Sequence, residues 1–427
     1  MKTTKLFYAT GACIVALCFT SCNNNDDDVR YMLPETRAIQ LTEEQKDMVK
    51  SNNDFSFNLL RTAYNQRQTA SEKGKSIFLS PTGVTYMLGM VANGASGETL
   101  KEINDALGFA GNSPSEVNNL CRTLIEEAPN TDKNVKLEIA NAIYTNKGYT
   151  LNEQFKADMN TYYKADAQTL DFAAPASLKT INDWARQNTH GMIPQFLGQL
   201  KPDAIAYLLN TIYFQATWTK QFDREKTKTE TFTKEDGTER QLQMMNNEAL
   251  ILSYENDDCR MVCLPYGSGT AWNMFVLLPK DGKTVEMVLN NMDNEYWNSL
   301  IHTINAKKLE LKLPKFITTD SHNLHYILPK MNVSKVFNSN FGLNRICPGK
   351  NVHISDMLQS GRIKVSEEGT KATAVTVSSL MDGASGPEPG GSPEIDQRLF
   401  HATKPFIYLI CENSTNAVFF AGVYQGD

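Results

Sequence analysis

Residues 205–214 are the part of the sequence that most restricts the possible folds of this chain. They read Ile-Ala-Tyr-Leu-Leu-Asn-Thr-Ile-Tyr-Phe, an almost continuous apolar run. A strand with one face in water alternates between apolar and polar residues, whereas a strand covered on both faces does not. We therefore expect residues 205–214 to form a buried central strand of a sheet.

Helical patterns come early in the chain and strand patterns dominate later. Helices are predicted at residues 53–63, 81–92, 98–107 and 115–127. Strands are predicted at residues 135–140, 274–278, 309–313, 406–410 and 418–424. This order predicts an α+β fold with segregated layers. No break in composition divides the chain after residue 53, so we predict one domain over residues 46–427.

Composition excludes several classes of protein. Hydrophobic residues make up 41% of the 427 residues and charged residues 21%, which excludes a disordered chain, a collagen and a coiled coil. The net charge is −6 and no block of lysine and arginine occurs, so a nucleic-acid partner is not expected.

The first 21 residues have the pattern of a secretion signal. Lys2 and Lys5 form a basic start, and residues 6–19 are apolar apart from Thr10. Small residues then precede Cys22, so the site resembles the lipobox of bacterial lipoproteins and predicts lipidation at Cys22. The alternative is ordinary signal cleavage near Ser21, with Cys22 incidental.

An acidic run follows Cys22 and predicts a flexible tether over residues 22–45. Acidic residues after a lipidated cysteine resemble the surface-export tag of Bacteroides-type lipoproteins, although a plain spacer would look the same. We expect a protein anchored by lipid in the cell envelope, on the outer-membrane surface or extracellular, with no other membrane contact.

No catalytic constellation is visible in the sequence, so an enzyme is not expected. The nucleophile, phosphate-binding, zinc-protease and dinucleotide motifs are all missing. His322 and His325 have a spacing that would suit a metal site, but a surface pair is the simpler interpretation. Asp203 and Asp223 flank the central apolar run and are interpreted as turn or capping residues. The cysteines show no zinc spacing and no disulfide framework, although one disulfide is possible. We predict no metal and no cofactor.

Ten short motifs occur in an order that resembles the serpin family. Each is weak alone, and together they cover about 375 residues. They lie at residues 76–81, 94–99, 137–144, 180–184, 209–214 with Trp218, 264–266, 277–279, 313–316, 404–406 and 420–422. The resemblance implies three β-sheets, about nine helices and an exposed reactive-centre loop over residues 367–398. It also implies a suicide-substrate mechanism, in which a protease attacks the loop and the cleaved loop inserts into the main sheet.

The start of this loop matches the hinge of inhibitory serpins. Insertion into a packed sheet buries every second side chain, so these side chains must be small and uncharged. The even-numbered residues of the hinge meet that demand. Lys371 is odd-numbered and would face away from the core. Besides Glu367 and the pivot Gly369, the hinge residues are Thr370, Ala372, Ala374, Thr376 and Ser378.

The family spacing places the reactive bond seventeen residues along the loop. Counting Glu367 as the first gives Gly383-Ala384, which would suit an elastase-like protease. A count shorter by two gives Met381, which suits chymotrypsin-, elastase- or papain-like pockets, and Asp382 would require an enzyme specific for acids.

Four further residues are expected to control opening of the sheet: Ser80, Asn210, Trp218 and Gln359. Family members often carry His-Lys where this chain has Gln359-Ser360. The resemblance implies that the histidine helps to hold the sheet shut beside Ser80 and Asn210, a role in which Gln359 would hydrogen-bond instead.

The function expected from the sequence is trapping of a serine or cysteine protease by a monomer that needs no cofactor. A non-inhibitory serpin that acts as a binding or scaffold module is the second hypothesis. A surface hydrolase or glycan-binding lipoprotein with a coincidental likeness is the third.

Overall fold

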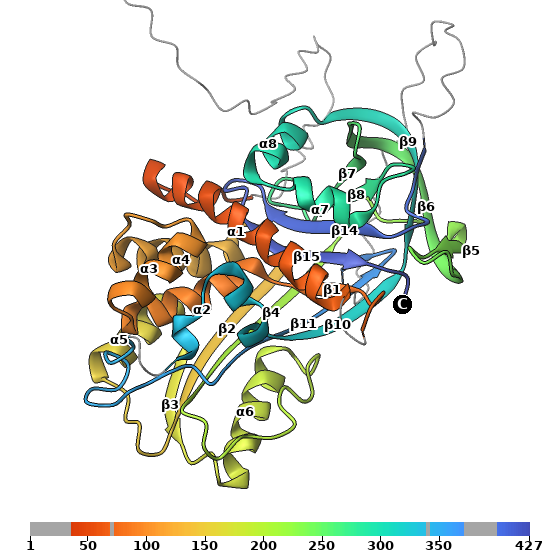
Figure 1. Cartoon of the computed structure of the whole chain (residues 1–427). Helices are drawn as coiled ribbons and strands as arrows, with labels where there is room; N and C mark the ends of the chain where they lie inside the picture. Colours follow the sequence, from red (N-terminus) through yellow and green to blue (C-terminus); the bar gives the residue numbers. More distant parts are fainter. Residues whose placement is uncertain (1–35, 69–71, 339–341, 371–398) are drawn as a thin grey trace, which may run out of the picture. The chain divides into compact units, whose positions relative to one another are not determined.

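The computed structural model describes residues 36–68, 72–338, 342–370 and 399–427 (Figure 1). Within them the compact unit Pro34–Asp427 contains eight α-helices, which extend the four predicted ones and add four. The helices are α1 (Glu43–Gln68), α2 (Pro81–Gly94), α3 (Gly97–Leu107), α4 (Pro114–Glu127), α5 (Glu153–Tyr163), α6 (Pro175–Asn188), α7 (Val285–Asn291) and α8 (Asn294–His302).

A six-stranded sheet contains the predicted central strand, which is β4 (Ala206–Thr217). The strand order is β10-β11-β12-β4-β2-β3, so β4 lies inside the sheet. The other strands are β2 (Val135–Asn146), β3 (Asp166–Leu170), β10 (Phe316–Asn323), β11 (Asp356–Ser366) and β12 (Gly369–Thr370).

The remaining strands form a nine-stranded sheet in the order β1-β15-β14-β8-β7-β6-β9-β13, with β5 beside β6. They are β1 (Ile77–Leu79), β5 (Lys228–Thr233), β6 (Glu239–Glu255), β7 (Cys259–Tyr266), β8 (Trp272–Pro279), β9 (Asn305–Pro314), β13 (Leu399–His401), β14 (Phe406–Glu412) and β15 (Val418–Tyr424). The three sheets expected thus appear as two in the described residues. The reason is β6, whose one end pairs with β5 and whose other end pairs with β7, so it joins two sheets into one.

Packing on both faces explains why β4 is mostly apolar. Leu208 and Phe214 belong to the main core, which the nine-stranded sheet and α2 share. Tyr207 and Leu209 point to the opposite face, where Ile181 of α6 belongs to a second, smaller cluster. The two-sided burial predicted for this strand is therefore confirmed.

The tether predicted to end at residue 45 ends earlier. Helix α1 begins at Glu43, and Ile39 is buried with its backbone N–H donating to Ser414 Oγ at 2.9 Å. The backbone N–H of Arg37 donates to the carbonyl of Thr131 at 2.9 Å. Residues 37–45 are thus fixed to the body. The sequence pattern did not predict this, because a single isoleucine can fill an apolar site without any periodicity in the sequence. Cys22 and the signal lie outside the described residues.

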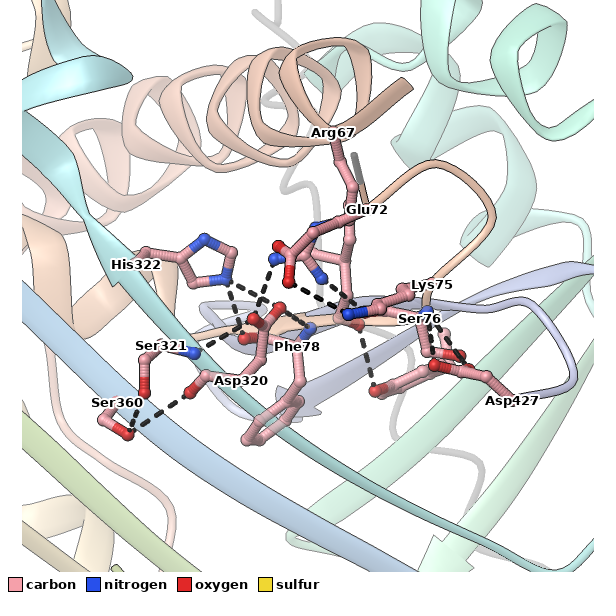
Figure 2. Close-up of polar contacts among 12 residues, drawn as sticks. Arg67, Glu72, Lys75, Ser76, Phe78, Asp320, Ser321, His322, Ser360 and Asp427 are labelled. Carbon is pink, nitrogen blue, oxygen red and sulfur yellow. Dashed lines mark hydrogen bonds and ion pairs between the residues drawn. The ribbon is translucent and has the colours of Figure 1, made fainter. Parts of the chain in front are cut away.

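A buried charged cluster ties β10 to β1 and α1 (Figure 2). Asp320 accepts from Arg67 Nη2 at 2.7 Å, from His322 Nε2 at 3.0 Å and from the Phe78 backbone N–H at 3.1 Å. His322 Nε2 also lies 3.1 Å from the Phe78 carbonyl. Both carboxylate oxygens of Asp320 therefore have partners, which is the condition for keeping this charge inside the fold.

The Asp320 carboxylate is more acidic than usual. Burial alone would raise its pKa, but the neighbouring His322 and Arg67 outweigh burial and lower the pKa from 3.8 to about 2. A group whose pKa is lower in the folded state stabilises the fold at pH values above its unfolded pKa. That contribution, about 2 kcal/mol here, is lost as the pH falls from about 4 through 2.

We predict that the acid sensitivity of the fold depends on this carboxylate. The urea midpoint of the natural chain should fall more steeply between pH 4 and pH 2 than that of an Asp320→Asn/Arg67→Met variant, in which neither charge remains. Asp320→Asn alone leaves Arg67 buried without its partner and should cost about 3–5 kcal/mol at pH 7. Equal pH profiles for the natural chain and the double variant would contradict the assignment.

Candidate functional site

The seam between β4 and β11 divides the six-stranded sheet. Along its first part the two strands pair directly and in parallel, from Tyr207 opposite Asp356 to Thr211 opposite Ser360. Beyond that point they separate, and the two residues of β12 lie between them. Strand β12 is antiparallel to both neighbours, with Thr370 opposite Val365 on one side and opposite Ala216 on the other. The seam is thus open at one end, and the beginning of a further strand fills that end.

A two-residue turn connects β11 to β12. Glu367 and Glu368 form the turn, Ser366 pairs with Gly369, and Ser366 Oγ donates to the Gly369 carbonyl at 3.1 Å. Gly369 has a φ of 142°, and a Cβ there would collide with the backbone of Ala216 and Thr217. Glycine is therefore required at this pivot.

Thr370 is buried and points into the core. Its Oγ1 lies 2.6 Å from the Tyr266 hydroxyl, and Tyr266 stacks on Trp218 with ring centroids 4.4 Å apart. Trp218 in turn donates from Nε1 to the Ser366 carbonyl at 2.9 Å. The predicted inward parity of Thr370 is thus seen directly. The first residues of the loop expected to be exposed, Glu367, Gly369 and Thr370, are instead buried, because they already belong to the sheet.

The turn is held by ion pairs that the sequence did not reveal. Glu367 accepts from Lys315 Nζ and from Thr227 Oγ1, both at 2.9 Å. Burial pushes the pKa of Glu367 upward, but hydrogen bonds led by the one from Lys315 lower it overall. Arg224 pairs with Glu368 on the exposed side of the turn. Both carboxylates are therefore neutralised while the turn stays in place.

Gln359 links the two sides of the seam where β4 and β11 pair directly, opposite Asn210. Its Nε2 donates to Asn210 Oδ1 and to the Ser80 carbonyl, both at 2.9 Å, and its Oε1 accepts from the Ser80 backbone N–H at 2.8 Å. Asn210 donates onward to Asn141 Oδ1 at 2.8 Å. Gln359 thus makes the hydrogen bonds expected of it, since an amide can donate and accept at once.

The other predicted site residues fall into two groups. Ala372, Ala374, Thr376 and Ser378 of the hinge lie outside the described residues, as do Met381, Asp382, Gly383 and Ala384. The interpretation of His322 and His325 as a surface pair is wrong for His322, which is buried in the Asp320 cluster. Among residues 36–370 and 399–427, with their short gaps, no group of three metal-binding side chains occurs.

Two smaller expectations, on Asp223 and on the cysteines, have clear outcomes in the described part of the chain. Asp223 caps a short 3-10 helix, accepting from the Glu225 N–H at 3.0 Å. The five cysteines of the body are free and buried. No described helix is both long and apolar enough to cross a membrane.

Comparison with known proteins gives consistent matches along the chain. A family described as Serpin (serine protease inhibitor) matches residues 50–425. An uncharacterized serpin-like protein of Thermococcus kodakarensis is 28% identical over 402 residues, which are 93% of this chain and 90% of the relative. The plasma serine protease inhibitor of Homo sapiens is 30% identical over 76% of this chain and 80% of its own.

Solved structures agree with these matches. Tengpin, a thermophilic serpin in its native state, superposes with a TM-score of 0.78 at 25% identity, covering 91% of this chain and 96% of its own. Human thyroxine-binding globulin complexed with thyroxine has a TM-score of 0.77 at 25% identity, covering 89% and 98%. The predicted fold is therefore confirmed.

We predict that Gln359→Leu makes the seam easier to open. The substitution leaves buried groups of Ser80 and Asn210 without partners, at about 1–3 kcal/mol. The thermal midpoint should fall, and a synthetic peptide of residues 369–379 should bind into the sheet faster, as fluorescence of a labelled peptide would report.

Ser360→Ala is the matched control, because Ser360 Oγ bonds only towards β10, to Ser321 and Asp320, and not across the seam. Equal peptide binding by the two variants would contradict the role of Gln359.

Proposed function

The chain belongs to the serpin family, and we propose that it is a suicide-substrate inhibitor that traps serine proteases, with cysteine proteases as a second target class. The observation that carries this proposal is β12: Gly369 and Thr370 already form the first rungs of an inserted strand. In the proposed reaction the protease serine attacks the loop carbonyl and the peptide bond breaks. The new amine leaves with a proton, and the acyl-enzyme ester remains on the loop.

If the register of β12 continues along the loop, it predicts the position at which each following hinge residue would insert. Each step along the loop moves one residue back along both β4 and β11. Ala372 would then lie between Phe214 and Ile363, Ala374 between Ile212 and Gly361, Thr376 between Asn210 and Gln359, and Ser378 between Leu208 and Met357. These positions face the core or the buried Gln359 link, so the small residues of the hinge fit where large or charged ones would not.

Insertion would also improve the pairing within the sheet. It would replace the parallel pairing of β4 with β11 by two antiparallel pairings, because β12 is antiparallel to both. Parallel pairing is slightly less stable per residue. Breaking it therefore costs less than the new strand returns, which supports a native state poised to convert after cleavage.

The same register supports Gly383-Ala384 as the reactive bond. The seam ends at Tyr207 and Asp356, which would lie opposite Ser379. Gly383 would then follow four residues beyond the sheet, whereas Met381 and Asp382 would leave only two and three. A protease joined to Gly383 would have more room beyond the end of the sheet.

Family membership alone does not distinguish inhibition from binding, because thyroxine-binding globulin shares the fold. A non-inhibitory binding role is therefore the second candidate. The small residues at every inward position of the hinge favour inhibition.

We also propose that Cys22 is lipidated and holds the protein in the cell envelope, at the outer-membrane surface. The support is the signal-like start and the small residues before Cys22. Cys22→Ser should move the protein from the membrane fraction to the soluble fraction. If the protein stays in the membrane fraction, the lipid anchor is wrong.

Mixing the protein with elastase-, chymotrypsin-, trypsin- and papain-like proteases should test inhibition directly. We expect a covalent complex that survives SDS with at least one of them. Mass spectrometry of the released C-terminal peptide should show that the peptide begins at Ala384. Cleavage without a complex across the whole panel would contradict the proposal.

Thr370→Arg should convert the inhibitor into a substrate, because it places a charge against Tyr266 in the core. Lys371→Arg is the matched control, since the same side chain would sit one residue along on the opposite parity. We expect the covalent complex to disappear from gels of Thr370→Arg and to persist for Lys371→Arg. Equal trapping by both would show that the parity does not govern insertion.

A further inference from the structure

Two histidines lie near each other at the closed end of the β4–β11 seam, where the two strands pair directly. His325 belongs to the short 3-10 helix Leu324–Tyr326, which follows β10 without a break. His353 lies just before β11, which begins at Asp356. Because β10 and β11 are antiparallel neighbours, the end of one strand lies beside the start of the other. The fold thus brings together two imidazoles that are far apart in the sequence.

A second 3-10 helix, Lys335–Phe337, packs against both histidine segments. The ring centroids of His325 and Phe337 are 4.6 Å apart. The segment that leads into β11 is held by the Ile354 N–H, which donates to the Val336 carbonyl at 2.9 Å. The two imidazoles therefore share one packed environment.

Each imidazole has a buried ring nitrogen without a partner. Neither His325 Nδ1 nor His353 Nδ1 has a hydrogen-bond partner among the described residues. A neutral imidazole carries a proton on one nitrogen only, whereas a protonated imidazole has two N–H groups and a positive charge. Protonation of both rings would therefore bury two like charges and leave N–H donors without acceptors.

The charged groups of the surrounding elements already have partners. Asp356 accepts from Lys201 Nζ at 3.1 Å and from Asn323 Nδ2 at 2.6 Å. Lys335 Nζ pairs with Glu102 at 2.5 Å. A further titratable neighbour is Tyr326, whose exposed ring lies 5.4 Å from that of His325 between centroids.

The His353 imidazole is correspondingly hard to protonate. Burial lowers its pKa below 6.5, and the neighbouring His325 lowers the pKa further. A group whose pKa is lowered in the intact structure takes up its proton more readily once that structure loosens. The stability that the neutral ring gives is complete above about pH 6.5 and is lost as the pH falls below that value.

Ser355 connects this histidine pair to the start of β4. Its backbone N–H donates to the Ala206 carbonyl at 2.9 Å, and its Oγ accepts from the Ile205 N–H at 2.8 Å. His353 Nε2 lies 3.4 Å from the same Oγ. A displacement of His353 would therefore disturb the hydrogen bonds that join the start of β11 to the start of β4.

We propose that His325 and His353 form an acid-sensitive joint, in which protonated rings repel each other and loosen the closed end of the seam. The joint is a property of the sheet and needs no protease. Its regulatory use rests on the proposed function, because the seam must part for a strand to enter and acid would make that parting easier.

Amide hydrogen exchange of the full chain at about pH 7.5 and about pH 5.5 tests the joint. After correction for the intrinsic effect of pH on exchange, we expect the protection of residues 203–209 and 352–358 to fall by about threefold or more at the lower pH. In His353→Gln the amide can still bond to Ser355 but does not titrate, so the fall should be much smaller. His325→Phe keeps a ring against Phe337 without a charge and should also reduce the fall.

His302→Gln is the matched control, because His302 is an exposed histidine at the end of α8. This variant should keep the whole fall in protection. His322 remains in every variant, so its ion pair with Asp320 affects all of them equally.

The joint would be overturned if the natural chain showed no fall in protection, or if either joint variant kept the whole fall. Neither result depends on trapping of a protease. Failure to form an SDS-stable complex would instead overturn the proposed function and leave the joint intact.

Discussion

The alternation of side chains at the β4–β11 seam is the constraint on which this molecule depends. A strand placed there has one face against the core, so every second residue must be small and uncharged. Thr370 meets this condition with its hydroxyl against Tyr266. Gly369 lets the backbone pass Ala216 and Thr217 where no Cβ would fit. Gly369 and Thr370 are paired with both neighbouring strands, and under the proposed insertion they would set the register of the hinge residues that follow.

The seam is held by uncharged groups in its middle and by charged groups around it. Gln359 joins Ser80 to Asn210 by hydrogen bonds alone. Gly83 of α2 has no side chain, and the Asn210 amide occupies that space. At the open end, Lys315 fixes Glu367, and on the far side Arg67 and His322 fix Asp320 of β10. Because an amide does not titrate, the Gln359 link itself keeps its hydrogen bonds across the range in which a histidine would change charge.

Local pattern was sufficient to predict the central strand, whereas the inward parity of Thr370 and the hydrogen-bonding role of Gln359 were predicted from the family resemblance. The ion pairs were not predictable, because Lys315 and Glu367, or Arg67 and Asp320, are far apart in the sequence and meet only in the fold. The joining of two sheets through β6 was also missed. Its many polar residues interrupt the apolar alternation by which a strand of 17 residues would be recognised. The end of the tether was placed too late, because burial of Ile39 depends on a site formed by distant segments.

Thermal unfolding before and after cleavage of the loop tests the central claim most directly. The claim is that, once the loop is cut, the seam accepts residues 371–379 as the continuation of the strand begun by Gly369 and Thr370. We expect the cleaved protein, with both fragments retained, to unfold at a markedly higher temperature than the intact protein, because the inserted strand pairs on both sides. A cleaved protein that unfolds at the same temperature or lower would contradict insertion, and with it the reading of this chain as a suicide-substrate inhibitor.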